Sequence, residues 1–135
     1  MLRLRLGNQA ASLETARLAA LEHVASHGLS DRAIYRLEMV LEELLMNVVW
    51  HAFNDSNEHI VELSLQIDGD RLALCLEHDG VAFDPLQQAA PQTPQSIAEA
   101  TPGGLGLALV RKAALDMRYD RADGRNRLRV WLARE

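Results

Sequence analysis

The sequence predicts an α+β fold, a two-layer sandwich of about three helices on a mixed, mostly antiparallel sheet. Apolar residues recur at helical spacing in three segments, and two pairs of alternating segments flank short turns that contain Asp and Gly. The helices do not alternate with every strand, which favours helices packed against an antiparallel sheet. With 135 residues, 48% of them hydrophobic, we expect a single domain over residues 1–135.

The first part of the chain predicts an edge strand and two helices. Leucine alternates with arginine over residues 2–6, the period of a half-buried strand. Helical spacing predicts an amphipathic helix over residues 10–27, stopped by Gly28. Its expected apolar positions are Leu13, Ala16, Leu18, Leu21, Val24 and Ala25. Ser30 offers the N-cap of a second, more apolar helix that we expect to reach about Phe53 and to be closed by residues 54–57.

The middle of the chain predicts a β-hairpin followed by a long loop. Residues 61–67 and 72–76 alternate on either side of a turn at residues 68–70. Residues 79–103 lose all periodicity and collect Pro and Gly. A loop of this length is typical of a functional segment, and we expect residues 84–103 to form a lid.

The last part of the chain predicts a helix and a second hairpin. Helical spacing returns over residues 104–117. Residues 117–122 and 128–133 alternate as strands, joined by a turn at residues 123–126.

Composition excludes several classes of function. The net charge of −5 and the scattered arginines argue against a nucleic-acid binder, which needs clustered positive charge. Cys75 is the only cysteine, so an internal disulfide and a Cys-rich zinc site are excluded. The sequence contains no apolar run long enough for a membrane span or a signal peptide. We therefore expect a cytoplasmic protein with no membrane partner.

The second helix carries the first candidate site. Glu43, Asn47 and His51 are spaced by four and therefore form one polar stripe on a largely apolar helix. An unpaired buried amide costs about 1–3 kcal/mol, so the stripe should face a cleft, a metal or a ligand. The structural alternative, in which the three side chains bond neighbouring backbone, is equally compatible with the spacing.

The segment after the first hairpin carries the second candidate. Asp79 and Gly80 follow the predicted strand end, where a glycine lets the backbone approach a ligand while a carboxylate accepts a hydrogen bond. A plain Asp-Gly turn, with Phe83 filling the core, is the better interpretation of this segment alone.

The third candidate opens the last helix, over Thr101-Pro102-Gly103-Gly104-Leu105-Gly106-Leu107. Glycines at a helix N-terminus leave backbone N–H groups free for an anion, which makes phosphate the natural ligand. The segment matches neither the Walker pattern nor a dinucleotide fingerprint. Taken alone, a purely structural role is the better interpretation.

Together the three segments resemble a known family. Glu43-x-x-x-Asn47-x-x-x-His51-Ala52, Gly80-x-x-Phe83-Asp84-Pro85 and Gly103-Gly104-Leu105-Gly106-Leu107 are similar to the N, G1 and G2 boxes of the GHKL (Bergerat) ATP-binding fold. The resemblance is strongest to bacterial anti-sigma factor serine/threonine kinases and covers essentially the whole chain.

The resemblance implies ATP and Mg²⁺ as cofactors and a role for each matching residue. Asn47 would give its side-chain oxygen to Mg²⁺, and Glu43 would be the catalytic base that takes a proton from a protein serine or threonine. The nucleotide-binding residues implied are Asn47, His51, His78, Asp79, Gly80, Phe83, Thr101, Gly103, Gly104, Leu105, Gly106 and Leu107.

Two positions depart from the family pattern. Where the family has the first Asp of Asp-x-Gly, this chain has His78, whose neutral imidazole could accept one hydrogen bond from adenine. Asp79 would have to twist inward against the strand alternation to replace it. No Lys or Arg occurs from Asp84 to Val110. The negative charge of the phosphates would therefore have to be balanced by Mg²⁺, by helix amides and by Arg111 or Lys112.

The resemblance leaves two functions open. One is a kinase that phosphorylates an anti-anti-sigma type protein and also sequesters a sigma factor. The other is a non-catalytic nucleotide-binding switch module that only holds its partner. A homodimer is compatible with either function, and neither requires direct contact with nucleic acid.

Overall fold

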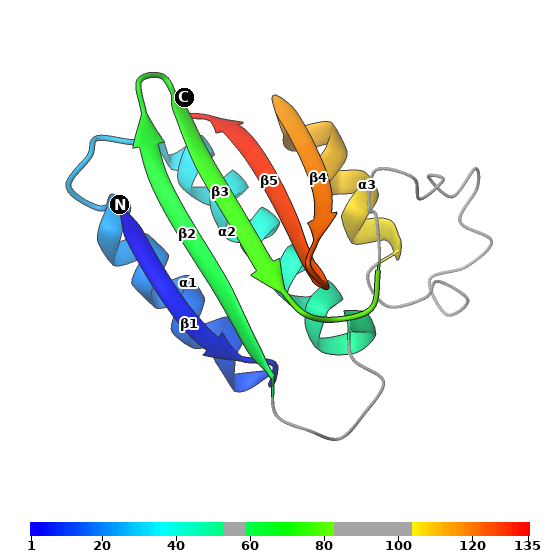
Figure 1. Cartoon of the computed structure of the whole chain (residues 1–135). Coiled ribbons are helices and arrows are strands. Elements are labelled where there is room, and N and C mark those ends of the chain that lie inside the picture. Colours follow the sequence, from blue (N-terminus) through cyan, green and yellow to red (C-terminus); the bar gives the residue numbers. More distant parts are fainter. Residues whose placement is uncertain (53–58, 83–103) are drawn as a thin grey trace.

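A computed structural model describes residues 1–52, 59–82 and 104–135 of the chain, and the side chains of all of these except residues 51–52 and 104–106. The expected lid at residues 84–103, Phe83 and the expected helix closure at residues 54–57 lie outside the described residues. The elements run in the order β1 (Leu2–Gly7), α1 (Ala11–Val24), α2 (Asp31–Asn47), the π-helix η1 (Val48–Ala52), β2 (Ile60–Asp68), β3 (Arg71–His78), α3 (Gly104–Ala113), β4 (Asp116–Ala122) and β5 (Arg125–Ala133) (Figure 1).

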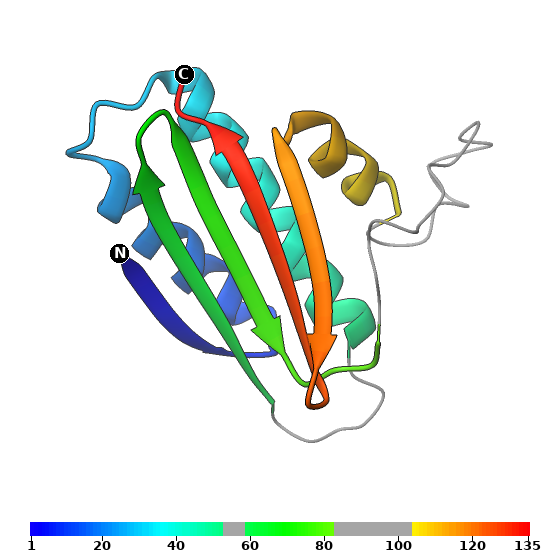
Figure 2. The ribbon, with the colours of Figure 1, turned by 45° about the horizontal axis from the view of Figure 1, so that its top comes forward.

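Within the described residues, five strands form one sheet in the order β1-β2-β3-β5-β4. All four strand pairings are antiparallel. The three α-helices cover one face of this sheet and leave the other open (Figures 1 and 2). The predicted α+β architecture is confirmed. Because β5 lies between β3 and β4, the end of β3 lies beside the β4–β5 turn, with His78 opposite Asn126.

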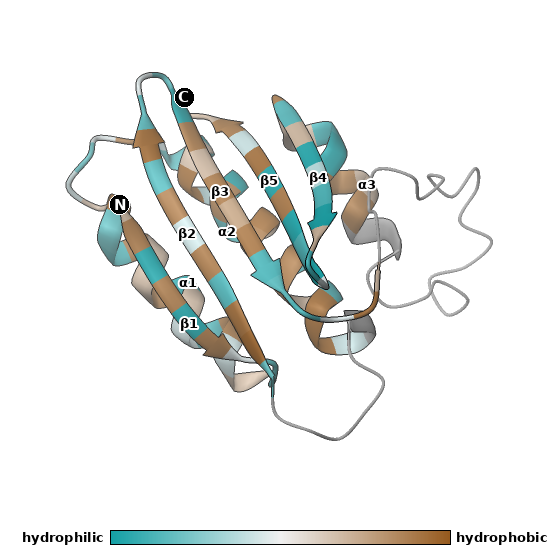
Figure 3. Cartoon of the chain, viewed as in Figure 1, coloured by the Kyte–Doolittle hydropathy of each residue, from teal (hydrophilic) through white to brown (hydrophobic). Residues whose placement is uncertain are grey.

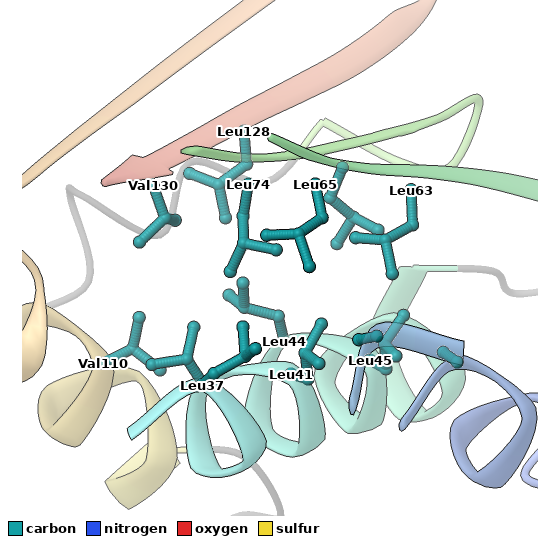
Figure 4. Packing of buried hydrophobic residues seen from close by; sticks show 14 of the residues in the cluster. Leu37, Leu41, Leu44, Leu45, Leu63, Leu65, Leu74, Val110, Leu128 and Val130 are labelled. Atoms are coloured by element: carbon teal, nitrogen blue, oxygen red, sulfur yellow. The ribbon is translucent and has the colours of Figure 1, made fainter. Parts of the chain in front are cut away.

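The core lies between the sheet and the helices. Apolar and polar residues alternate along the strands, as the hydropathy colours show (Figure 3). Leucine and valine side chains from β2, β3 and β5 point toward those of α2 and α3 (Figure 4). The labelled members of this cluster are Leu37, Leu41, Leu44, Leu45, Leu63, Leu65, Leu74, Val110, Leu128 and Val130.

Both hairpin turns are tighter than the sequence predicted. Ala122 pairs with Arg125, so the β4–β5 loop is the dipeptide Asp123-Gly124. Both of its residues have positive φ, 54° and 76°, as the type I′ hairpin turn requires. Gly69 likewise has a φ of 64° at the first position of the β2–β3 loop.

The prediction that Leu18 faces inward was wrong. The buried positions of α1 are Ala16, Ala20 and Val24, which share one face at a spacing of four. Leu18 is two residues from this stripe, about 200° around a helix, and its side chain is 54% exposed.

Three helix ends also differ from the prediction. The first helix ends at Val24 and not at His27, which leaves Ala25, expected to face inward, exposed beyond the helix. The second helix keeps α geometry only to Asn47, after which η1 continues as a π-helix. The last helix ends at Ala113 and not at Met117. The Leu115 N–H donates to the Trp131 carbonyl of β5, so the chain is already bonded to the sheet at this residue. No helix in the described residues combines the length and apolarity that a membrane crossing requires.

The core assignment predicts a large difference in stability between two leucine substitutions. Leu37 is completely buried, and Leu37→Ala should lower the free energy of unfolding by about 2–5 kcal/mol. Leu18→Ala, its matched control, should change it by no more than about 0.5 kcal/mol. Urea unfolding of both variants measures this, and equal losses would contradict the assigned faces.

Candidate functional site

A small hollow of about 20 Å³ lies where α2, β3, α3 and the β4–β5 hairpin meet. It contains predicted residues from all three sequence segments, namely Asn47, His78 and Leu107. The lining residues are Leu44, Asn47, Val48, Leu76, His78, Leu107, Tyr119, Asn126 and Leu128. A largely apolar wall with a few polar groups is typical of a small-molecule site. The hollow itself has room for about one water molecule, so it marks the place where these residues converge and not the full volume of a ligand.

Asn47 reaches this hollow because the helix around it is packed on the sheet. Leu44 and Val48, which flank it on the helix surface, are both buried and also line the hollow. Asn47 is half-buried, and its side-chain amide makes no hydrogen bond within the described residues. Because the amide is also partly exposed, it is free to bind a ligand in the hollow.

Glu43 lies one turn before Asn47, about 6 Å along the helix axis, and does not itself line the hollow. It is half-buried, and this burial raises the pKa of its carboxyl group, with a further contribution from the negative charge of Glu42. A carboxylate of raised pKa is a stronger proton acceptor once it is ionised.

His51, the third residue of the predicted polar stripe, lies in η1, beyond the end of α-helical geometry. The stripe of Glu43, Asn47 and His51 assumes that α geometry continues, whereas η1 begins at Val48. The Val48 N–H still donates to the Leu44 carbonyl, its α-helical partner, and also to the Leu45 carbonyl. The side chain of His51 lies outside the described residues. Short π segments within helices are frequent at functional sites.

His78 is buried at the end of β3, where it accepts a hydrogen bond. The Gly80 N–H donates to its Nδ1 atom at 3.1 Å. Burial lowers the pKa of this histidine to about 4, so the ring is neutral at pH 7 and carries its hydrogen at Nε2. Nδ1 is therefore already in use and does not serve as the acceptor for an adenine amine.

Asp79 and Gly80 take different directions after β3. The Asp79 carboxylate lies 3.3 Å from Nδ1 of His59, is about half exposed, and does not line the hollow. The Gly80 backbone is buried and turns toward the β4–β5 hairpin.

Asn126 is a residue of the hollow that the sequence analysis missed. Its side chain is 2% exposed and donates to the carbonyls of Gly80 and Val81, each at 3.1 Å. Its Oδ1 accepts from the Tyr119 hydroxyl and from Arg121, which also donates to the Gly80 carbonyl at 3.0 Å. The strand alternation held a signal, because Asn126 shares the inward face of β5 with Leu128, Val130 and Leu132.

The glycine-rich segment begins α3 beside the hollow. Gly104 is the first residue of the helix, as predicted, and Leu107 lines the hollow. Thr101 and Gly103 lie outside the described residues, as do the side chains of Leu105 and its neighbours in residues 104–106. Arg111 and Lys112 are exposed in the last turn, about two turns from the N-terminus of α3.

The described residues contain no group of three or more His, Cys, Asp or Glu side chains that could hold a metal ion. Any metal in this hollow would need oxygen ligands from an amide and from the bound molecule itself. That set suits Mg²⁺, which is usually held by few protein ligands together with substrate phosphates.

Comparisons with known proteins give the relatives of this chain. The histidine kinase-like ATPase domain family matches residues 6–132. Serine/threonine-protein kinase BtrW of Bordetella bronchiseptica is 36% identical over 122 residues, which are 87% of this chain and 84% of that protein. Serine-protein kinase RsbW of Bacillus velezensis is 34% identical over 78 residues, and this match spans 55% of the chain and 49% of that protein.

A solved structure shares the fold. The RsbU and RsbW domains of Rv1364c from Mycobacterium tuberculosis superpose with a TM-score of 0.64 at 15% identity. The match covers 98% of this chain and 32% of that chain.

The burial of His78 predicts an unusual titration. An unfolded histidine titrates near 6.5, whereas His78 in the fold titrates near 4, so the unfolded state binds more protons between these values. Stability should therefore fall as the pH drops from about 6.5 to about 4. His78→Asn, which retains an acceptor for the Gly80 N–H, should flatten this dependence.

An NMR titration of the His78 ring measures its pKa directly, with the His78→Asn variant assigning the resonance. We expect a midpoint near 4. A midpoint near 6.5 would mean that the ring is exposed to water.

Proposed function

We propose that this chain binds ATP with Mg²⁺ in the hollow beside Asn47. The chain belongs to the histidine kinase-like ATPase family and is a protein serine/threonine kinase. It transfers the γ-phosphoryl group to a serine or threonine of an anti-anti-sigma type protein. The observation that carries the proposal is the half-buried Asn47 amide, which faces the hollow and has no hydrogen-bond partner within the described residues.

Asn47 is the protein ligand in this proposal. Its carboxamide oxygen is a hard donor of the kind that Mg²⁺ prefers, and Asn47 lines the hollow. Bound Mg²⁺ neutralises charge on the nucleotide phosphates. The N-terminus of α3, which begins at Gly104 beside the hollow, contributes the positive end of a helix dipole to the same phosphates.

Glu43 is the base in the transfer step. Its carboxylate takes the proton of the serine or threonine hydroxyl while that oxygen bonds to the γ-phosphorus. The bond from phosphorus to the β–γ bridging oxygen breaks, and ADP leaves with that electron pair. The raised pKa of Glu43 favours this proton transfer, because a stronger base takes a hydroxyl proton more readily.

The choice of protein substrate rests on the sequence motifs and on the two relatives, which are named as serine or serine/threonine kinases. A sigma factor is the second partner that the resemblance implies. The family pattern also makes a homodimer the assembly to test first.

One observation favours a second candidate, a nucleotide-binding module that holds its partner without transferring phosphate. The acceptor nitrogen of His78 is used by the Gly80 N–H, which weakens the case for tight adenine recognition. Labelled ATP and an anti-anti-sigma type protein distinguish the two functions. Transfer that depends on Glu43 supports the kinase, and tight binding without transfer supports the module.

The proposal predicts that Asn47→Ala weakens Mg²⁺-dependent ATP binding at least about tenfold, a loss of about 1.4 kcal/mol, while the fold is retained. Gln66→Ala is the control, because it removes an exposed amide far from the hollow on β2. Calorimetry with and without Mg²⁺ measures both affinities. An unchanged affinity in Asn47→Ala would remove this residue from the site.

A second prediction separates the two neighbouring glutamates. Glu43→Gln should lower the transfer rate about 10²- to 10⁴-fold and leave ATP affinity unchanged, because only the proton acceptor is lost. Glu42→Gln should keep the rate at neutral pH. It should also shift the acid limb of the rate profile to lower pH, since the charge of Glu42 raises the pKa of Glu43. Equal losses of rate in the two variants would contradict the assigned base.

A further inference from the structure

Trp50 is the large apolar side chain most exposed near the proposed site. It lies in η1, three residues after Asn47, and is 60% exposed. Met46 and Val49, its neighbours in the sequence, are half-buried. Together these three side chains form an apolar patch at the end of the helix that carries Glu43.

The position of this patch bears on any protein substrate. Seven residues separate Glu43 from Trp50, about two helical turns or about 10 Å along the axis. A folded protein that brings a hydroxyl group to Glu43 covers an area wider than this distance, since an interface of standard size buries about 800 Å² per partner. The end of the helix therefore lies within the footprint of a docked substrate.

The charge of this helix segment also bears on its partner. From Leu37 to Trp50 the charged residues are all acidic, namely Glu38, Glu42 and Glu43. Glu38 is paired with Arg17 at 3.0 Å. Glu42 is exposed and forms no ion pair within the described residues, so it stays available to a basic partner surface, whereas Glu43 is reserved for the transfer step.

We infer that the protein substrate docks on Trp50. The Trp50 ring fills an apolar depression on the substrate, which lies beside the phosphorylated serine or threonine and has a rim of basic residues. This inference rests on the proposed function and adds the residue that selects the substrate. Tryptophan is enriched among the residues that dominate protein interfaces, because it buries a large area at a low cost in side-chain entropy. Trp50 contacts the substrate protein and takes no part in the chemistry.

The test is steady-state phosphorylation of purified anti-anti-sigma type proteins from the same genome. Trp50→Ala should raise KM for the protein substrate at least about tenfold, with kcat and the Kd for ATP unchanged within about twofold. Tyr35→Ala is the matched control, because Tyr35 is a 72% exposed aromatic residue on α2, about 22 Å away along the helix. It should change KM by less than about twofold.

Three outcomes overturn the inference while leaving the kinase proposal in place. They are an unchanged KM in Trp50→Ala, a KM raised equally in Tyr35→Ala, and a loss in Trp50→Ala that falls on kcat or on ATP affinity. A higher salt concentration should weaken substrate binding to the wild type, and an affinity independent of salt would contradict the basic rim.

A binding measurement decides the inference even if no phosphate is transferred. Trp131→Phe leaves Trp50 as the single tryptophan of the chain. Titration with the same purified proteins should then shift the Trp50 emission to shorter wavelength as the ring leaves water. Binding without any change in emission, or no binding by any of the proteins, would overturn the docking role. Absence of transfer alone would overturn only the kinase proposal.

Discussion

The packing of α2 against the sheet is the constraint on which every candidate site residue depends. Leu37, Leu41, Leu44, Leu45 and Val48 are all at most 5% exposed, and they fix how far the helix is rotated about its axis. Burying each of these side chains contributes about 1.5–3 kcal/mol, so together they strongly favour one orientation of the helix on the sheet. The leucines therefore determine where Asn47 lies, and the hollow follows from their packing.

The polar wall of the hollow is largely satisfied by the protein itself. Asn126 uses both its amide group and its oxygen to join β5 to Gly80, Val81, Tyr119 and Arg121. His78 is held neutral by burial and accepts from Gly80. Among the lining residues that the structure describes, none presents a charged side chain at neutral pH. In the proposed complex, phosphate charge is balanced by the N-terminus of α3 and by Mg²⁺, which agrees with the absence of Lys and Arg between residues 84 and 110.

The sequence predicted the elements whose periodicity is long and whose turns are specific. Both hairpins and the α-helices of the described residues could be assigned from spacing and from Gly and Asp positions. The nucleotide-binding roles of the three segments came only from the family resemblance and stay a prediction. The π-helix could not be assigned from spacing, since its residues continue the same apolar pattern as α2. The inward position predicted for Leu18 was wrong because apolar residues occur on more than one side of α1. The face that is buried is the one with Ala16, Ala20 and Val24. Asn126 was missed because a polar residue next to a turn looks ordinary unless strand alternation places it inward.

The measurement that tests the account most directly is an NMR titration of the isotope-labelled chain with Mg²⁺ and a non-hydrolysable ATP analogue. The account predicts that the largest shifts fall on the side-chain amide of Asn47 and on His78, Leu107 and Asn126, which line one hollow. Shifts concentrated on the open face of the sheet, around Arg3, Ser64 and Cys75, would place the nucleotide elsewhere and contradict the central claim.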